Sequence, residues 1–271
     1  MTALTFLIPV RHPQNSPDWS RLKANLAQTV GSIAAQTNGD WRGVVIANEG
    51  ADLPPLPQRF SVEWVHFPPN ARHEKTGSEA TTDFLDAFRI DKGRRVLKGM
   101  LHARDSRFFM IVDDDDFVSS RITQFVADHP HANGWTVDLG YVWDDGGRML
   151  YRHPRLNHVC GSSLIIRSDL YGLPESFESA TPDFIKTMLG SHRRIGSILA
   201  ERGTPLASLP FPGSIYRVAH GGSHSGTPSI LKQYVFSRDL IRKPHLLVRN
   251  LVRLRLVDTA VKREFFGEAA S

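Results

Sequence analysis

The sequence has 271 residues, 41% of them hydrophobic, and a formal net charge of +5. This length allows one large domain with a substantial core, and the single cysteine, Cys160, excludes an internal disulfide and a cysteine-based zinc site. No apolar run approaches the roughly 20 residues of a membrane-spanning helix, and the N-terminus lacks the pattern of a signal peptide. We therefore expect a cytoplasmic protein whose mild positive charge suits an anionic partner.

Strands and helices alternate along the first half of the chain. Apolar runs and helical spacing predict buried strands at residues 4–10, 41–47, 62–67 and 108–112 and helices at 19–36 and 92–104. This alternation is typical of a parallel sheet with helices on both faces.

The rhythm changes after residue 116. Short helices are predicted at 122–128, 183–189 and 194–201, a hairpin from strands 134–143 and 148–151, and further strands at 162–167 and near Ile215. The last segment, 234–266, is predicted to be helical and basic.

Four consecutive aspartates, Asp113 to Asp116, follow the strand predicted at 108–112. Four adjacent carboxylates repel one another, and a bound cation would relieve that repulsion. Mn²⁺ or Mg²⁺ favours oxygen ligands and keeps positions open for phosphate oxygens and water. This acidic run therefore predicts a divalent-metal site for a diphosphate, with a solvated acidic turn as the alternative.

Other polar residues stand at the ends of neighbouring predicted strands. Arg11 follows the first strand, and Asn48 and Glu49 follow the second. Ligands of open α/β sheets bind at the carboxyl ends of the strands, so Asn48 and Glu49 are predicted to bind a base or ribose, unless they only form a polar turn. Arg94, Arg95 and Lys98 in the basic helix are predicted to neutralise a diphosphate, with a solvated helix face as the alternative.

A metal site of this kind would also need a third protein ligand, and a reaction at the site would need a general base. His220 lies in a glycine- and serine-rich segment and is a candidate ligand because neutral imidazole is acceptable to Mn²⁺; an ordinary loop is the alternative. A general base must lie within hydrogen-bond reach of the proton that it takes, and Glu175, Glu178, Asp183 and His192 are candidates, of which we single out Asp183 and His192.

The tail is predicted to be an amphipathic helix. Leu247, Leu251 and Leu254 share one face, and Arg249 and Arg253 share another. A basic amphipathic helix can lie on an anionic membrane surface, although packing on the domain with its charges in water is an alternative. No nucleic-acid-binding motif is present, so we expect no nucleic-acid partner.

Four segments resemble family-2-like glycosyltransferases of the GT-A fold: FLIPV at 6–10, WRGVVI at 41–46, FMIVDDDD at 109–116 and GSSLIIR at 161–167. With the predicted elements, the resemblance implies an α/β fold with a single GT-A-like domain, whose mainly parallel central sheet is flanked by helices and followed by a helical tail. Residues 1–116 would then be the nucleotide-sugar-binding half, 117–230 the acceptor-binding half of the same domain, and 231–271 the tail.

The resemblance also implies an activity. A nucleotide-diphosphate sugar donor would bind through Mn²⁺ or Mg²⁺, and the sugar would pass to a hydroxyl of a glycan or lipid-linked acceptor. Polysaccharide or cell-envelope assembly is the expected pathway, in the cytoplasm or at the inner face of a membrane. Asp113 would contact the ribose or the metal, Asp115 would be the main metal ligand, and Asp114 would help with donor contacts or cap the turn.

Two features depart from the family. The Glu-Asp pair that usually precedes its last helices is not evident, and Asn48 and Glu49 stand where an Asp-Asp pair is common. Aspartate clusters at strand ends also serve metal-dependent phosphohydrolases and nucleotidyltransferases. A non-catalytic GT-A-like binding module is a third possibility.

Overall fold

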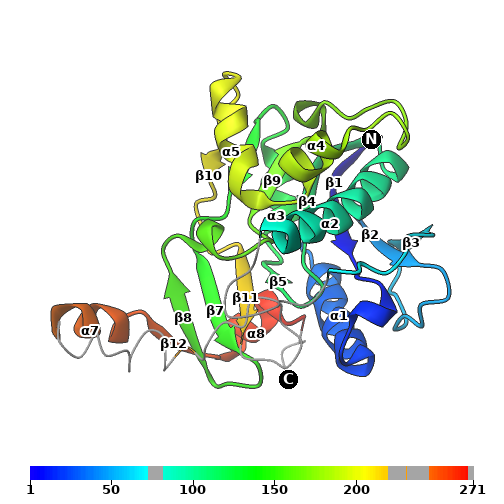
Figure 1. Cartoon of the computed structure of the whole chain (residues 1–271). Coiled ribbons are helices and arrows are strands. Elements are labelled where there is room, and N and C mark those ends of the chain that lie inside the picture. The colour runs from blue at the N-terminus through cyan, green and yellow to red at the C-terminus, as the bar shows by residue number, and fades with distance from the viewer. Residues whose placement is uncertain (73–81, 219–229, 231–243, 268–271) are drawn as a thin grey trace.

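The structure, a computed structural model, describes residues 1–72, 82–218, 230 and 244–267, which form two β-sheets with helices packed around them (Figure 1). In chain order, the larger sheet contains β1 (Thr2–Pro9), β2 (Trp41–Asn48), β3 (Phe60–Val65), β4 (Ser106–Ile111), β6 (Gly134–Thr136), β9 (Leu164–Arg167) and β10 (Ala207–Ser208). The smaller sheet contains β5 (Phe117–Val118), β7 (Gly140–Asp144), β8 (Met149–His153), β11 (Ser214–Val218) and β12 (Leu254–Leu256). The described helices are α1 (Trp19–Ala34), α2 (Thr82–His102), α3 (Ile122–Asp128), α4 (Pro182–Phe184), which continues as a π-helical turn (Ile185–Leu189), α5 (His192–Glu201), α7 (Pro244–Leu251) and α8 (Thr259–Phe265).

The larger sheet is mixed but mostly parallel. Its described strands have the order β10-β6-β9-β4-β1-β2-β3, and only the pairings of β9 with β4 and with β6 are antiparallel. The prediction of a mainly parallel central sheet flanked by helices is therefore confirmed. The carboxyl ends of β4, β1, β2 and β3 lie along one edge, where most of the predicted site residues follow them.

Helices cover both faces of the larger sheet because successive side chains of a strand point to opposite faces. Phe6 and Ile8 of β1 pack with Leu26 of α1 in one core cluster. Leu7, between them, packs with Met100 of α2 in another. Strands covered in this way read as continuous apolar runs, which is why β1 is recognisable from its sequence.

The segment predicted as one strand over 134–143 divides between the two sheets. β6 pairs with β9, and the ring of Trp135 lies 5.4 Å from that of Phe108 in the main core. After Asp138 the chain crosses to the smaller sheet, where β7 and β8 form an antiparallel hairpin. The predicted hairpin is confirmed only from Gly140 onward.

The prediction of a helical tail needs correction. α7 and α8 are helical, but β12 between them pairs antiparallel with β8. The Leu-Arg-Leu pattern of β12 suits a strand because Leu254 packs against the core while Arg255 is exposed. In the part of the chain that the structure describes, no helix combines the length and the apolarity needed to cross a bilayer.

Candidate functional site

The acidic run, Asp113 to Asp116, lies at the carboxyl edge of the larger sheet. β4 is the parallel neighbour of β1, and the Val112 backbone N–H extends this pairing by donating to the Leu7 carbonyl at 2.9 Å. The run therefore begins directly where the two central strands end. The run thus lies at the edge where open α/β sheets bind ligands.

The four carboxylates alternate in exposure. Asp114 and Asp116 are buried, with 7% and 0% of their surface exposed, whereas Asp113 and Asp115 are partly exposed. The side chains that face solvent are thus the two that the sequence singled out as the working pair. The buried two hold the turn in place, each in a different way.

Asp116 anchors the run inside the protein. Its carboxylate accepts hydrogen bonds from Ser162 Oγ at 2.7 Å, from Cys160 Sγ at 3.3 Å and from the Arg217 backbone N–H at 3.3 Å. Burial, with the nearby charges of Asp115 and Asp113, raises the pKa of Asp116 well above its usual value. The turn after β4 is therefore tied to β11 and to the segment before β9.

Asp114 is buried beside Arg11, which lies in the loop that follows β1. Arg11 Nη2 lies 4.0 Å from Asp114 Oδ1, so the structure brings Arg11 to the acidic run. Burial raises the pKa of Asp114 to about 6, while Arg11 lowers it and the neighbouring aspartates raise it further. Asp114 Oδ2 has no hydrogen-bond partner, so a buried acceptor oxygen is left free within the run.

Asp113 is held by a lysine that the sequence did not single out. Lys92 of α2 reaches the run, and its Nζ forms an ion pair with Asp113 Oδ1. Burial disfavours the charged form of Lys92, but the carboxylates of Asp113 and Asp116 outweigh burial and raise its pKa. Gly161 packs against this ion pair. A β-carbon at Gly161 would overlap Asp113 Oδ2 and lie 3.1 Å from Lys92 Nζ.

The side chains at the acidic run can be compared with the ligands that a divalent cation needs. Among the described residues, no group of three or more histidine, cysteine, aspartate or glutamate side chains is placed to hold a metal ion. The predicted third ligand, His220, lies outside the described residues. Asp113 and Asp115 fit a different arrangement, because Mg²⁺ is commonly bound by one or two carboxylates together with the phosphates of a substrate.

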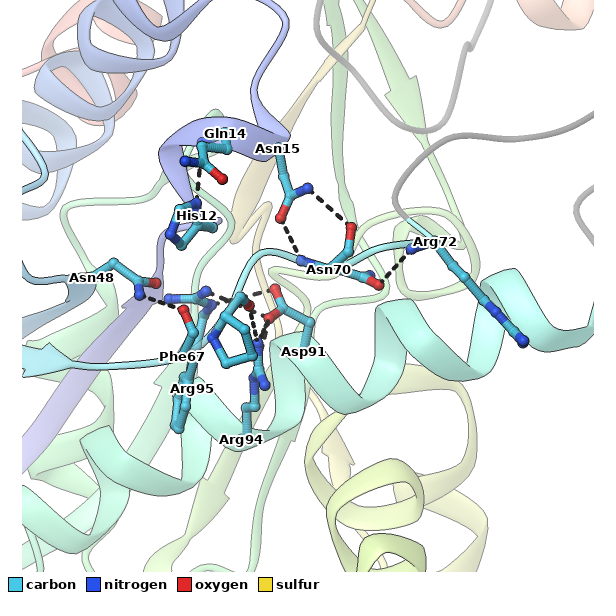
Figure 2. Close-up of polar contacts among 11 residues, drawn as sticks. His12, Gln14, Asn15, Asn48, Phe67, Asn70, Arg72, Asp91, Arg94 and Arg95 are labelled. Carbon is cyan, nitrogen blue, oxygen red and sulfur yellow. Dashed lines mark hydrogen bonds and ion pairs between the residues drawn. The ribbon is translucent and has the colours of Figure 1, made fainter.

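A second polar cluster lies at the ends of β1 to β3, around Asp91 of α2 (Figure 2). Asp91 forms ion pairs with both Arg94 and Arg95. Arg94 also donates to the Pro68 carbonyl at 3.0 Å and lies 4.3 Å from the centroid of the Phe67 ring. Arg94, predicted to neutralise a diphosphate, thus fixes the loop after β3.

Two buried polar atoms in this cluster lack partners. Asn48 Nδ2 donates to the Phe67 carbonyl at 2.7 Å, but Asn48 Oδ1 accepts nothing. Arg95 is 1% exposed, and its Nη1 donates to nothing. Unpaired buried polar atoms are costly, so a free acceptor and a free donor at the strand ends suit a polar ligand. His12 faces the same cluster, and burial, followed by the charge of Arg95, lowers its pKa.

Two other predicted contacts lie farther out. Glu49 is exposed and pairs with His66 at 3.0 Å, which places it at the rim of the cluster. Lys98 has its Nζ 4.7 Å from the centroid of the Phe177 ring. The structure therefore brings Arg11, Asn48 and Arg94 toward the strand ends, and places Lys98 against a different segment.

The two predicted general bases differ in position. His192, the first residue of α5, lines a small cavity together with Lys92 and Gly161. Asp183 lies in the first turn of α4, is exposed, and does not line this cavity. His192 Nε2 is buried without a partner. Burial, and then the charge of Lys92, lowers the pKa of His192 to about 4, so its imidazole is neutral at pH 7 but a weak base.

This lowered pKa predicts a pH-dependent stability. Because the folded protein disfavours the protonated ring, stability is lost as pH falls from about 6.5 toward about 4. Between pH 7 and pH 5, we expect the wild type to lose about 2 kcal/mol more unfolding free energy than His192→Gln. Urea unfolding at both pH values measures the difference. The exposed His131→Gln should behave like the wild type; equal losses for all three proteins would contradict the prediction.

A larger cavity of about 570 Å³ lies beyond Phe117, the residue after the acidic run. Phe117, Trp143 and Phe266 line it, together with Arg148 and Lys262. The rings of Phe117 and Phe266 meet edge to face with centroids 4.6 Å apart. An aromatic wall with two cations at one cavity suits an organic ligand with polar or anionic groups.

Comparisons with known proteins give a fold-level similarity. No protein-family model matches the chain, and no curated protein matches its sequence. S. aureus TarS is similar with a TM-score of 0.45 and 12% identity, over 80% of this chain and 37% of that one. Residues 1–349 of S. aureus TarS in complex with UDP-GlcNAc give a TM-score of 0.44 and 13% identity, over 93% and 72%.

A putative glucose-1-phosphate thymidylyltransferase from Bacillus anthracis, in complex with sucrose, gives a TM-score of 0.38 and 9% identity, over 83% of this chain and 90% of that one. The chain spans 37% of the length of the full TarS chain. At these scores and identities the likeness concerns the arrangement of strands and helices. Inferences about activity depend on the geometry of the site.

Proposed function

We propose that this chain is a metal-dependent glycosyltransferase of the GT-A type, which moves a sugar from a nucleotide-diphosphate sugar to an acceptor hydroxyl. The observation that carries the proposal is the alternation within the acidic run. Asp113 and Asp115 are left partly exposed at the carboxyl end of β4, while buried Asp114 and Asp116 fix the turn. A cluster whose charges served only to solvate a turn would not bury two of its four carboxylates.

Asp113 and Asp115 would hold Mn²⁺ or Mg²⁺, with His220 as the proposed third ligand. When bound, the cation would neutralise the negative charge that develops on the leaving nucleoside diphosphate. Lys92, next to Asp113, adds a fixed positive charge for phosphate oxygens, because charge-assisted hydrogen bonds to phosphate are strong. Arg11 supplies a second cation from the neighbouring strand end.

The nucleoside would lie over the cluster at the ends of β1 to β3. Asn48 Oδ1 and Arg95 Nη1 are buried without partners, so the edge of a base would pair with them after a local rearrangement of this cluster. Glu49 at the rim is the proposed ribose contact. The Phe67 ring already has Arg94 4.3 Å from its centroid and stacks with Phe177 at 5.5 Å, so recognition through base edges fits better than stacking on this ring.

The acceptor, a glycan or a lipid-linked sugar, is proposed to approach from the side of residues 117–230. His192 is the better placed of the two candidate bases because it lines the cavity beside Lys92. Its lowered pKa of about 4 makes it a weak proton acceptor, so Asp183 is kept as the second candidate. Single variants of each residue, assayed with a saturating donor, distinguish them.

A thermal-shift screen of UDP, GDP and dTDP, with and without Mn²⁺, tests the proposal. Binding to the native state raises the melting temperature, and at about 100 times the dissociation constant we expect a rise of about 5 °C or more. The rise should need both the metal and one of the diphosphates. No rise with any nucleotide, or the same rise without metal, would overturn the proposal.

Product analysis by mass spectrometry separates the alternatives. A glycosyltransferase releases a nucleoside diphosphate and a glycosylated acceptor from a sugar donor. Free phosphate or pyrophosphate would instead identify a phosphohydrolase or a nucleotidyltransferase. Binding of metal and nucleotide without turnover of any donor would identify a binding module.

A further inference from the structure

The tail carries an unusual share of exposed apolar surface. Eight large hydrophobic side chains are exposed among the described residues, and four of them lie in the tail between residues 248 and 256. These four, which we call the apolar patch, are Val248, Leu251, Val252 and Leu256, with exposed fractions of 60%, 46%, 81% and 61%. Contiguous exposed apolar side chains mark sites of interaction with a partner or a membrane.

The orientation of α7 is fixed by polar contacts on its opposite side. Asn250 is 5% exposed and accepts a hydrogen bond from the Tyr151 hydroxyl at 3.1 Å. The Val252 backbone N–H donates to the Val248 carbonyl at 3.1 Å, so Val248, Leu251 and Val252 share one helical face. A helix packed on a soluble domain turns its apolar face inward, whereas α7 anchors a polar residue and turns this face to solvent.

α7 also projects beyond the smaller sheet, away from the helices that cover the larger one (Figure 1). Leu256 belongs both to the apolar patch and to the lining of the larger cavity. The patch therefore begins on a projecting helix and ends at the rim of that cavity.

A cation flanks the apolar patch on α7. Arg249 is exposed, whereas Arg255 on β12 pairs with Asp258 at 3.2 Å and donates to the Tyr141 hydroxyl at 3.0 Å. Residues 244–267 contain five lysines and arginines against two carboxylates, Asp258 and Glu264. Apolar side chains flanked by an arginine match the interface of an anionic bilayer, where acyl chains lie beneath negatively charged headgroups.

A second copy of the chain is a poorer match for this surface. β12 is an edge strand in the described smaller sheet, but Arg253 and Arg255 stand on it and beside it. Charged side chains on an edge strand oppose the addition of another strand. Two patches face to face would also bring like charges together.

We propose that the apolar patch docks on an anionic lipid bilayer, with Val248, Leu251, Val252 and Leu256 entering the interface and Arg249 contacting lipid phosphates. This docking is peripheral, and it does not depend on the proposed function. It corrects the sequence-based choice of Leu247 and Leu254 for the membrane face, because both are partly buried.

Vesicle co-sedimentation of the full chain tests this proposal. We expect binding to phosphatidylcholine vesicles that contain about 30 mol% phosphatidylglycerol, and little binding to pure phosphatidylcholine. The double variant Leu251→Ser/Val252→Ser should bind about tenfold more weakly, since two apolar side chains no longer enter the interface. The variant Arg249→Gln should also bind more weakly, and the wild type should lose affinity at high salt.

Trp64→Ser is the matched control, because Trp64 is 44% exposed on β3 and lies outside the tail. It should bind like the wild type, and circular dichroism melting should be unchanged in all variants. Equal binding of the wild type and the Leu251→Ser/Val252→Ser variant would overturn the proposal. So would a wild type that ignores vesicles but forms a dimer that this variant loses, because the patch would then belong to a second copy.

Discussion

Replacing Asp115 with asparagine is expected to lower the rate of sugar transfer by about a thousandfold or more, with little change in the fold. Asparagine keeps the size of the side chain but removes the charge that would hold the divalent cation. Metal ions contribute several kcal/mol to the stabilisation of charge in a transition state, and about 4 kcal/mol corresponds to a thousandfold in rate. Calorimetry in Mn²⁺ should show that binding of the nucleotide-sugar donor is also lost.

The same substitution is expected to leave the stability of the fold nearly unchanged. The charge of Asp115 raises the pKa of both Asp114 and Asp116, after the larger effect of burial. Removing that charge relieves repulsion inside the acidic run but also removes an attraction to the buried Arg217 guanidinium, so the melting temperature should change little. Activity lost at nearly unchanged stability separates a functional role from a structural one.

Asp169→Asn is a suitable control for Asp115→Asn, since the Asp169 side chain is 63% exposed and pairs with Arg167 at the surface. Its activity and donor binding should match those of the wild type. Donor binding that is unchanged in Asp115→Asn would contradict a metal-bridged diphosphate. A melting temperature that falls by many degrees would show that Asp115 is a structural residue.

Gly161→Ala is expected to reduce transfer by about a hundredfold, through a single added methyl group. A β-carbon at Gly161 would overlap Asp113 Oδ2, so the Asp113 carboxylate must rotate away from its place beside Lys92. Because the carboxylate is the end of a short side chain, the cost in stability should be modest, about 1–2 kcal/mol. Misplacing a metal ligand by about 1 Å is enough for a hundredfold loss of rate.

Gly31→Ala in α1 provides the matched control, because a β-carbon there meets nothing within 4 Å. Alanine is the better helix former, so Gly31→Ala should raise the unfolding free energy by up to about 1 kcal/mol and leave activity intact. The measurements are initial rates at saturating donor and urea unfolding. Wild-type activity in Gly161→Ala would show that the position of Asp113 does not matter for the reaction.

The sequence by itself determined the elements whose signal is local. α3 has the predicted bounds of Ile122–Asp128, and β1, β2 and β4 lie within two residues of their predicted positions. Their apolar runs are continuous because both faces of the strands are covered. The edge of the sheet at which Arg11, Asn48 and the acidic run meet also followed from the order of these elements.

Only the tertiary structure decided which carboxylates of the acidic run stay partly exposed. Asp116 is buried because Ser162, Cys160 and Arg217 converge on it from distant parts of the chain, and no local pattern shows such partners. In the same way, Lys92 rather than Lys98 reaches the run, because the two side chains leave α2 toward different neighbours. The third ligand His220, the cation and the donor stay predictions.

The tail shows the same division. The positive charge of the tail and the spacing of its leucines predicted a basic amphipathic helix. Pairing with β8 instead made Leu254–Leu256 a strand. That pairing, with the contact of Asn250 on Tyr151, set which apolar residues face solvent. The spacing of apolar residues within a segment indicates whether that segment is a helix or a strand. Which of its side chains are buried depends on partners about a hundred residues away in the chain, and a local pattern carries no information about them.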